Sequence, residues 1–309
     1  MKILFRHIIL LTLTLLAAAC TKERTMPEEN GMYYWRTDLH LDQTESNFIK
    51  EHHINRLFVR FFDVVMSEDG QPIPNATLTF SSALPDSLEV VPVVYIINDC
   101  MKAPATGIAE KLVDRIWQMC ETNDIAAPKE LQIDCDWTPT TRENYFAFLT
   151  ELRRLTDIKG ARLSVTIRLH QLRESPPPAD LGALMLYNTG DVTRLDVAKP
   201  ILDLRDVKPY IGNLQDYDLP LRTAYPIFGW RVLFRKGNFV GIIHYEDEYP
   251  VMPTDTIVER RPTAEDVMAT YHAVEKASKG INRSVILFDL QTENINRYEK
   301  DFYEEILHH

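Results

Sequence analysis

The sequence predicts a (β/α)8 barrel, and three observations point to this fold class. Eight segments have the apolar, β-branched character of buried parallel strands, helical segments separate most of them, and residues 32–309 match the length of such a barrel. The composition is that of an ordinary globular protein, with 45% apolar and 26% charged residues. The alternative fold is an open doubly wound sheet, which normally has fewer strands and a glycine-rich phosphate-binding loop.

The expected strands alternate with the expected helices along most of the chain. The strands lie at 32–37, 56–63, 89–98, 130–136, 162–170, 183–188, 222–228 and 283–290. The helices lie at 42–52, 106–123, 141–155, 201–214, 263–279 and 294–307. Two apolar runs flank Lys236-Gly237-Asn238 and interrupt this order, so 231–244 is expected to be a β-hairpin inserted after the seventh strand.

Residues 1–19 have the pattern of an export signal. Lys2 and Arg6 supply its positive start, and the apolar run over 8–16 is too short for a comfortable membrane span. Three alanines then precede Cys20, which resembles the lipobox of bacterial lipoproteins, where the cysteine becomes the lipidated first residue. We expect a signal peptide at 1–19 and a lipid-anchored tether at 20–31. An ordinary cleaved signal with an incidental cysteine is the alternative.

The residues after the lipobox favour one face of the cell envelope. Thr21 rather than Asp follows Cys20, and by resemblance to lipoprotein sorting rules this favours the outer membrane. The mixed charges of Lys22, Glu23 and Arg24 do not resemble the acidic tag of some surface lipoproteins. The sequence therefore predicts an outer-membrane lipoprotein that faces the periplasm, with surface display as the open alternative.

Charge and missing motifs exclude several classes of partner. The formal net charge is −11 at pH 7, and an acidic protein repels phosphate backbones, so no nucleic acid is expected to bind. Neither GxxxxGK(S/T) nor GxGxxG occurs, so no nucleotide cofactor is expected. No CxxC or HxxxH spacing indicates zinc. A cluster of Asp134, Asp136 and Asp289 offers oxygen ligands for Ca²⁺ or Mg²⁺, but we expect no metal there.

Three cysteines remain after Cys20, and an odd number cannot all pair internally. Cys100 and Cys120 are able to form a bridge in an oxidising compartment. We favour the other interpretation, in which both residues and Cys135 are buried thiols.

Polar side chains occupy alternate positions on the fourth and fifth expected strands. Residues alternate sides along a strand, so the apolar odd positions of 131–136 pack against helices while Gln132, Asp134 and Asp136 point to the barrel axis. On the next strand the same side carries Ser164, Thr166, Arg168 and His170. Burying the two acids without partners costs several kcal/mol, so they are either paired with Arg168 and the hydroxyls or bind a ligand.

The two acids are not equivalent in this pattern, and other strand ends add polar and aromatic groups. Asp136 lies nearer the C-terminal mouth, where barrel sites gather, so we expect it to be functional, while both interpretations stay open for Asp134. Aromatic faces beside carboxylates and amides suit sugar rings. The expected lining residues are Arg168, His170, Tyr187, Asn188, Tyr225 and Asp289, with Trp137 and Trp230 stacked on the sugar and Trp35 nearby. Core packing is the alternative for each aromatic residue.

The fourth strand resembles the D-x-x-D-x-D-x-E motif of family-18 glycoside hydrolases, the chitinase-like barrels. Asp134 and Asp136 match its second and third acids, and Leu131 replaces the first. Thr138 stands where the family has its catalytic Glu, which protonates the leaving oxygen while the substrate's acetamido group attacks. A threonine hydroxyl has no proton to give at a useful pKa, so this substrate-assisted chemistry is not expected here.

Other segments extend the resemblance to roughly half of the chain. Residues 185–188 resemble the sixth-strand M-x-Y-D of family 18, and 224–229 loosely match its seventh-strand segment. A closer overall similarity is to the uncharacterised bacterial family named domain of unknown function 3142. That family has an I-Q-x-D-x-D strand, a Y-x-x-F/L-L-x-x-L-R helix and an L-S-x-T strand, which here are 131–136, 145–153 and 163–166.

The sequence therefore predicts an envelope lipoprotein whose barrel binds a glycan and hydrolyses it. Asp136 is the first choice for the acid or base, with Asp134 tuning it, because two carboxylates can cleave a glycoside without the family-18 Glu. The expected second carboxylate is one of Asp63, Asp99, Asp289 and Glu293. Two alternatives stay open: a barrel that binds a glycan without cleaving it, and an envelope assembly protein whose mouth contacts a protein.

Overall fold

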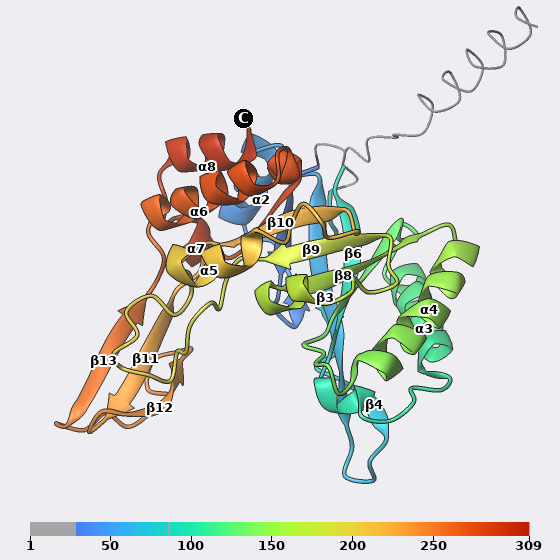
Figure 1. Cartoon of the computed structure of the whole chain (residues 1–309), viewed down its shortest axis with the longest axis horizontal. Helices are drawn as coiled ribbons and strands as arrows, with labels where there is room; N and C mark the ends of the chain where they lie inside the picture. Colours follow the sequence, from blue (N-terminus) through green and yellow to red (C-terminus); the bar gives the residue numbers. More distant parts are fainter. Residues whose placement is uncertain (1–28, 86, 309) are drawn as a thin grey trace, which may run out of the picture.

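Parallel strands close into a barrel in the computed structural model, which describes residues 29–85 and 87–308 (Figure 1). In spatial order the barrel strands are β1 (Gly31–Tyr34), β3 (Arg56–Met66), β6 (Glu89–Ile96), β7 (Glu130–Asp134), β8 (Arg162–Arg168), β9 (Leu181–Met185), β10 (Leu221–Pro226) and β14 (Val285–Phe288). The ring is closed because β1 pairs with β14 on one side and with β3 on the other. The predicted (β/α)8 barrel is confirmed, and the open sheet is excluded.

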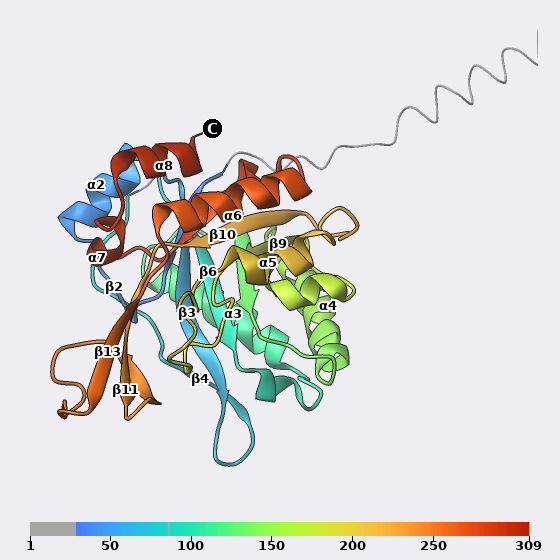
Figure 2. The same ribbon diagram turned by 60° about the vertical axis from the view of Figure 1, so that its left-hand side comes forward.

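Helices follow most of the barrel strands and lie on the outside of the ring (Figures 1 and 2). They are α2 (Gln43–Glu51), α3 (Ile108–Thr122), α4 (Arg142–Ile158), α5 (Leu204–Ile211), α6 (Ala264–Ala277), α7 (Thr292–Ile295) and α8 (Lys300–Leu307). The single helix expected at 294–307 is therefore two helices, α7 and α8. Within the described part of the chain, no helix is both long and apolar enough to cross a membrane.

Two barrel strands are followed by other structure instead of an α-helix. After β3 the chain turns back as β4 (Pro72–Asn75), which pairs antiparallel with β3. It then forms β5 (Thr79–Phe80), which pairs with β2 (Asp38–Leu39). After β8 comes only the 3-10 helix η2 (Leu169–Arg173). The other 3-10 helices are η1 (Asn98–Met101) and η3 (Ile281–Arg283).

A three-stranded antiparallel sheet is inserted after β10 and projects from the barrel in both views (Figures 1 and 2). Its strands are β11 (Trp230–Arg235), β12 (Asn238–Ile243) and β13 (Asp255–Arg260), with β11 in the centre. The predicted hairpin is present as β11 and β12, whereas β13 is an additional strand. Its charged sequence is typical of a surface loop, but Arg260 is buried and donates to the Leu195 carbonyl oxygen (2.8 Å).

The two faces of the barrel strands carry different side chains, as the alternation on β7 predicts. Leu131 and Ile133 are fully buried in the large apolar layer between the barrel and its helices. Gln132 and Asp134 lie on the other face, where Gln132 accepts a hydrogen bond from the Tyr33 hydroxyl (2.7 Å). The polar groups expected inside the barrel are therefore present.

The amino end of the barrel is held together by buried charges. Glu130 is fully buried and accepts hydrogen bonds from Arg222 Nη1 (2.5 Å) and Arg56 Nη1 (3.0 Å). Burial alone would raise the pKa of Glu130, but Arg222, a hydrogen bond from Ser164 and the charge of Arg56 hold that pKa below its usual range. This cluster links β3, β7 and β10 across the barrel, at the end opposite the mouth.

The three cysteines of the described chain are buried free thiols. Burial raises the pKa of Cys100 to about 11 and that of Cys120 to about 12. Both thiols therefore stay protonated near neutral pH and pack as small apolar groups. The prediction of three buried thiols is confirmed, and Cys100 and Cys120 do not form a bridge.

Candidate functional site at the barrel mouth

A cavity of about 280 Å³ opens at the carboxyl ends of the barrel strands. Its lining residues are Trp35, Arg60, Asp63, Tyr95, Asp134, Asp136, Arg168, Met185, Tyr187, Asn188 and Phe288. They come from the ends of most barrel strands, so residues far apart in the sequence meet at this face, where barrel sites gather. The predicted site residues that lie here are Asp134, Asp136, Arg168, Tyr187 and Asn188, together with Trp35 and with Asp63, one of the candidates for a second carboxylate.

Asp134 is the buried acid of the cavity. Its Oδ1 accepts a hydrogen bond from the Thr166 hydroxyl (2.7 Å) and another from Arg168 Nη2 (3.0 Å). Burial raises the pKa of Asp134, although Arg168 and Thr166 oppose the rise. The sequence leaves two interpretations open for Asp134, a paired buried network and a role in binding a ligand. The paired network is present, and Asp134 also lines the cavity.

Arg168 joins both acids of the fourth-strand motif. Its Nε donates to Asp136 Oδ1 while its Nη2 holds Asp134, so one guanidinium bridges the two carboxylates. The Asp136 side chain is 53% exposed, compared with 5% for Asp134. A ligand that enters the mouth therefore meets Asp136 first.

A second ion pair in the cavity lies on β3. A register irregularity between Arg60 and Phe62 brings Arg60 and Asp63 to the same side of the strand, although their spacing in a regular strand would place them on opposite sides. Arg60 Nε donates to Asp63 Oδ1 (2.6 Å), and Nη2 donates to the other carboxylate oxygen. Each carboxylate that lines the cavity therefore contacts a guanidinium.

Aromatic rings form one wall of the cavity. Phe288 packs against Trp35, with ring centroids 5.5 Å apart, and against Tyr187, at 5.1 Å. Trp35 is only partly buried, so part of its ring faces the cavity. The Tyr187 hydroxyl is buried and has no hydrogen-bond partner within residues 29–85 and 87–308. Buried hydroxyls usually have a hydrogen-bond partner, so the Tyr187 hydroxyl is available to form a hydrogen bond with a ligand.

Tyr225 and Asp289, which the sequence places at the mouth, lie outside the cavity. The side chain of Tyr225 points to the helical layer, and its hydroxyl donates to Asn282 Oδ1 (2.9 Å), because the neighbouring Ala224 takes the inward position on β10. Asp289 follows the cavity residue Phe288 and is turned away from it. Burial raises the pKa of Asp289 to about 6, although its carboxylate accepts hydrogen bonds from two neighbouring amides.

The expected stacking tryptophans and His170 also lie elsewhere. Trp137 is 1% exposed and packs against Phe146 of α4, so it offers no face to a sugar. Trp230 packs against Phe228, which in turn touches the aromatic wall, but Trp230 does not line the cavity. The strand β8 ends at Arg168, and His170 lies exposed on η2, because the alternation stops where the strand does.

Thr138 occupies the motif position of the family-18 acid and does not line the cavity. Its hydroxyl contacts the Thr140 hydroxyl (2.8 Å), and its backbone N–H donates to Thr141 Oγ1 (3.0 Å). Asp99, one candidate for a second carboxylate, is exposed and pairs with Lys102 (2.8 Å) away from the mouth. Within the described part of the chain, the cavity therefore has no carboxyl group that is free of a guanidinium.

Solved structures with a similar architecture are chitinase-like enzymes. A chitinase from Chromobacterium violaceum ATCC 12472 is 13% identical, with a TM-score of 0.57 over 90% of this chain and 97% of that one. The spore cortex-lytic enzyme SleL of Bacillus megaterium QM B1551 is 13% identical, with a TM-score of 0.54 over 87% and 72%. The chain has the fold of the chitinase-like barrels. At these identities the likeness shows the fold alone.

The Ostrinia furnacalis Group IV chitinase, solved in complex with allosamidin, is 12% identical, with a TM-score of 0.54 over 90% of this chain and 97% of that one. No family model matches the chain, and no curated protein matches it either. The distant resemblance to family-18 barrels is therefore supported by the fold. The closer similarity to the domain of unknown function 3142 is not shown.

The sequence pattern identified Asp134 and Asp136 but not Arg60, Tyr95, Met185 and Phe288. Tyr95 pairs in register with Asp134 on the neighbouring strand, so applying the same alternation to β6 identifies it. Arg60 has no such signal, because it reaches the cavity through an irregularity of β3 that the sequence does not reveal.

Proposed function

We propose that the barrel binds a glycan at its C-terminal mouth and does not cleave it by family-18 chemistry. One observation decides against cleavage: Arg168 holds both acids of the fourth-strand motif. Thr138, in place of the acid that would protonate a leaving group, agrees with it. A carboxylate paired with a guanidinium is a good hydrogen-bond acceptor for sugar hydroxyls but a poor proton donor. The sequence favours hydrolysis over binding alone, whereas the pairing of both acids with Arg168 favours binding without cleavage.

Sugar recognition at this site rests on complementary surfaces. Trp35 presents part of an aromatic ring, which suits the C–H face of a pyranose. The half-exposed Asp136 and the amide of Asn188 supply polar groups for hydroxyls around the ring. A cavity of about 280 Å³ fits one sugar ring, with further rings outside the mouth.

Removing the aromatic face should weaken glycan binding. We expect Trp35→Ala to lower the affinity at least about tenfold, because its partly exposed ring is an apolar face on which a sugar can stack. The measurement is a glycan array that includes chito-oligosaccharides, followed by calorimetric titration of the strongest binder. Trp117→Ala, which removes a partly buried tryptophan on α3, is the matched control. An array with no binder would instead favour the assembly-protein alternative.

Hydrolysis with Asp136 as acid or base, tuned by Asp134, is the second candidate. The observation in its favour is the pair of unequal environments, since one acid is buried with a raised pKa and the other is open at the mouth. We expect Asp136→Asn to abolish any turnover of a bound oligosaccharide, measured by chromatography of the products. Turnover that survives this change rules out Asp136 as the acid or base.

We also propose that the chain is a lipoprotein of the outer membrane, facing the periplasm and anchored through Cys20. Cys20 lies outside the described residues, so this proposal rests on the lipobox-like segment before it. Cys20→Ala should abolish incorporation of radiolabelled palmitate and move the protein from the outer-membrane fraction to the soluble fraction. Retention of the label by the variant would contradict lipidation at this residue.

A further inference from the structure

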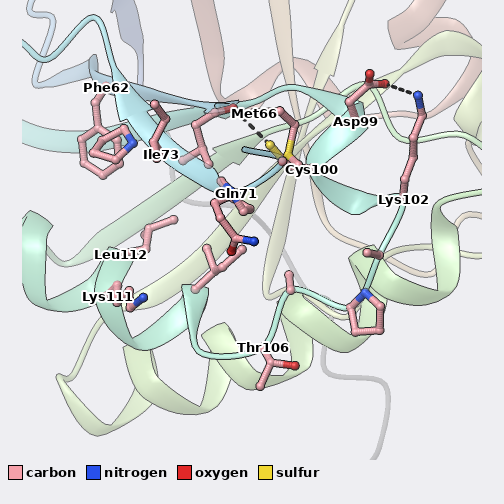
Figure 3. Close-up of a pocket in the computed structure, with 18 of the residues that line it drawn as sticks. Phe62, Met66, Gln71, Ile73, Asp99, Cys100, Lys102, Thr106, Lys111 and Leu112 are labelled. Carbon is pink, nitrogen blue, oxygen red and sulfur yellow. Dashed lines mark hydrogen bonds and ion pairs between the residues drawn. The ribbon is translucent and has the colours of Figure 1, made fainter. Parts of the chain in front are cut away.

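A larger cavity lies outside the barrel, apart from the mouth. It has a volume of about 680 Å³ and lies between the β3–β4 hairpin, η1 and the start of α3 (Figure 3). The outward positions of β3 face this cavity, whereas Asp63 between them faces the mouth. The two cavities therefore lie on opposite faces of the same strand. A volume of this size is typical of sites for small organic ligands.

The walls of this cavity are mainly apolar. Phe62 and Met66 extend from β3 and Ile73 from β4, and Leu112 of α3 lies across from them (Figure 3). Ile73 is 42% exposed, so part of its side chain is open to solvent at the cavity. The shape and the lining suit an alkyl chain.

The rim of the cavity is positively charged, although the chain as a whole is acidic. Lys111 and Arg115 are one turn apart on α3, and both line the cavity. Within residues 29–85 and 87–308, neither forms an ion pair with a carboxylate, whereas the rim acid Asp99 is already paired with Lys102 (2.8 Å). The rim therefore carries two cations with no protein counterion in the described structure.

Two further features of this rim favour an anionic ligand. The Arg115 guanidinium lies 5.1 Å from the centroid of the Phe62 ring and donates to Thr77 Oγ1 (3.0 Å), but its buried Nε has no hydrogen-bond partner among the described residues. The start of α3 also lines the cavity, and no side chain caps it at Gly107. An uncapped helix start adds partial positive charge beside the two cations.

We propose that this cavity binds a single-chain anionic amphiphile, with its alkyl chain against Phe62, Ile73 and Leu112 and its acidic head at Lys111 and Arg115. Charge complementarity selects the anionic head, because the rim offers uncompensated cations and its acid is already neutralised. The apolar walls select the alkyl chain. The site is independent of the proposed glycan site.

The test uses the purified full chain with laurate as the probe, detected by displacement of the fluorescent dye 1-anilinonaphthalene-8-sulfonate. We expect laurate and dodecyl phosphate to displace the dye at lower concentration than dodecyl maltoside or dodecyltrimethylammonium, which share the alkyl chain. The double variant Lys111→Glu/Arg115→Glu should weaken laurate at least about tenfold and leave dodecyl maltoside unchanged. Lys208→Glu, a charge reversal at an exposed lysine of α5, is the matched control.

A second variant tests the cavity itself without changing charge. Ala105→Trp places a large ring at the cavity wall and should abolish laurate binding, with circular dichroism showing that the barrel remains folded. Equal binding of laurate and dodecyl maltoside, or unchanged laurate affinity in either variant, would overturn the proposal.

Discussion

Replacing Glu130 with Gln should lower the free energy of unfolding by about 3 kcal/mol at pH 7. Glu130 is fully buried and is the shared counterion of Arg222, itself 1% exposed, and Arg56, which is 4% exposed. An amide of the same shape fills the space but leaves buried guanidiniums with less compensating charge. Removing one partner of a buried ion pair is costly because the other charge stays behind. Urea denaturation of the two proteins measures the difference.

The stability that Glu130→Gln loses should decrease as the pH falls. The folded protein holds the pKa of Glu130 below its usual range, so this carboxylate contributes stability above its unfolded pKa, and the contribution is lost as the pH falls through the folded pKa. The gap between wild type and variant should therefore be full at pH 7 and narrow in acid, below the unfolded pKa of about 4.3.

Glu151→Gln is the matched control for this prediction. Glu151 pairs with Arg154 on the surface of α4 (2.8 Å), where both side chains are largely exposed. Exposed pairs of this kind contribute little to stability, because water and salt screen the two charges. If Glu130→Gln and Glu151→Gln cost the same, the charges at the amino end do not hold the barrel together.

Replacing Arg168 with Met should lower the free energy of unfolding by about 3 kcal/mol at pH 7. It should also abolish glycan binding at the mouth. Arg168 is the charged partner of the buried Asp134 and fixes Asp136 at the cavity edge. Without the guanidinium, a buried carboxylate either stays unpaired or takes up a proton. Chemical denaturation and calorimetric glycan titration measure the two effects.

The stability that Arg168→Met loses should increase as the pH rises. Burial already raises the pKa of Asp134 in the wild type, and Arg168 is the main group that opposes the rise. Removing Arg168 therefore raises that pKa further. A raised folded pKa gives stability that is present at low pH and lost as the pH rises through it, so the deficit of the variant should grow from pH 4 to pH 7.

The double variant Arg168→Met/Asp134→Asn controls for this mechanism, because it removes both buried charges together. We expect it to recover part of the lost stability and to lose the extra pH dependence. A double variant that is as unstable and as pH-sensitive as Arg168→Met would contradict the role assigned to the Arg168–Asp134 pair.

The barrel was predictable from the sequence because local pattern and global fold agree. The alternation on β7 separates Leu131 and Ile133, which pack against helices, from Gln132 and Asp134, which face inward. The strand β13 was not predictable in this way. It pairs with the inserted hairpin through backbone hydrogen bonds, and its mixed charged and apolar sequence carries little signal of that pairing.

The site was predictable only where strands stay regular. Asp134, Asp136 and Arg168 follow the alternation to the mouth, whereas Arg60 reaches it through an irregularity of β3. The sequence assigns Tyr225 and Trp137 to the wrong face for a different reason. Each stands one position away from an inward residue, and a shift of one residue turns a side chain to the other face.

The most direct test of the glycan proposal is a crystal structure of the chain soaked with the strongest binder from the glycan array. We predict an uncleaved oligosaccharide with one ring against Trp35 and hydroxyls within hydrogen-bond distance of Asp136 and Asn188, while Arg168 still bridges Asp134 and Asp136. A glycan bound away from Trp35, or a sugar cleaved at the mouth, would contradict it.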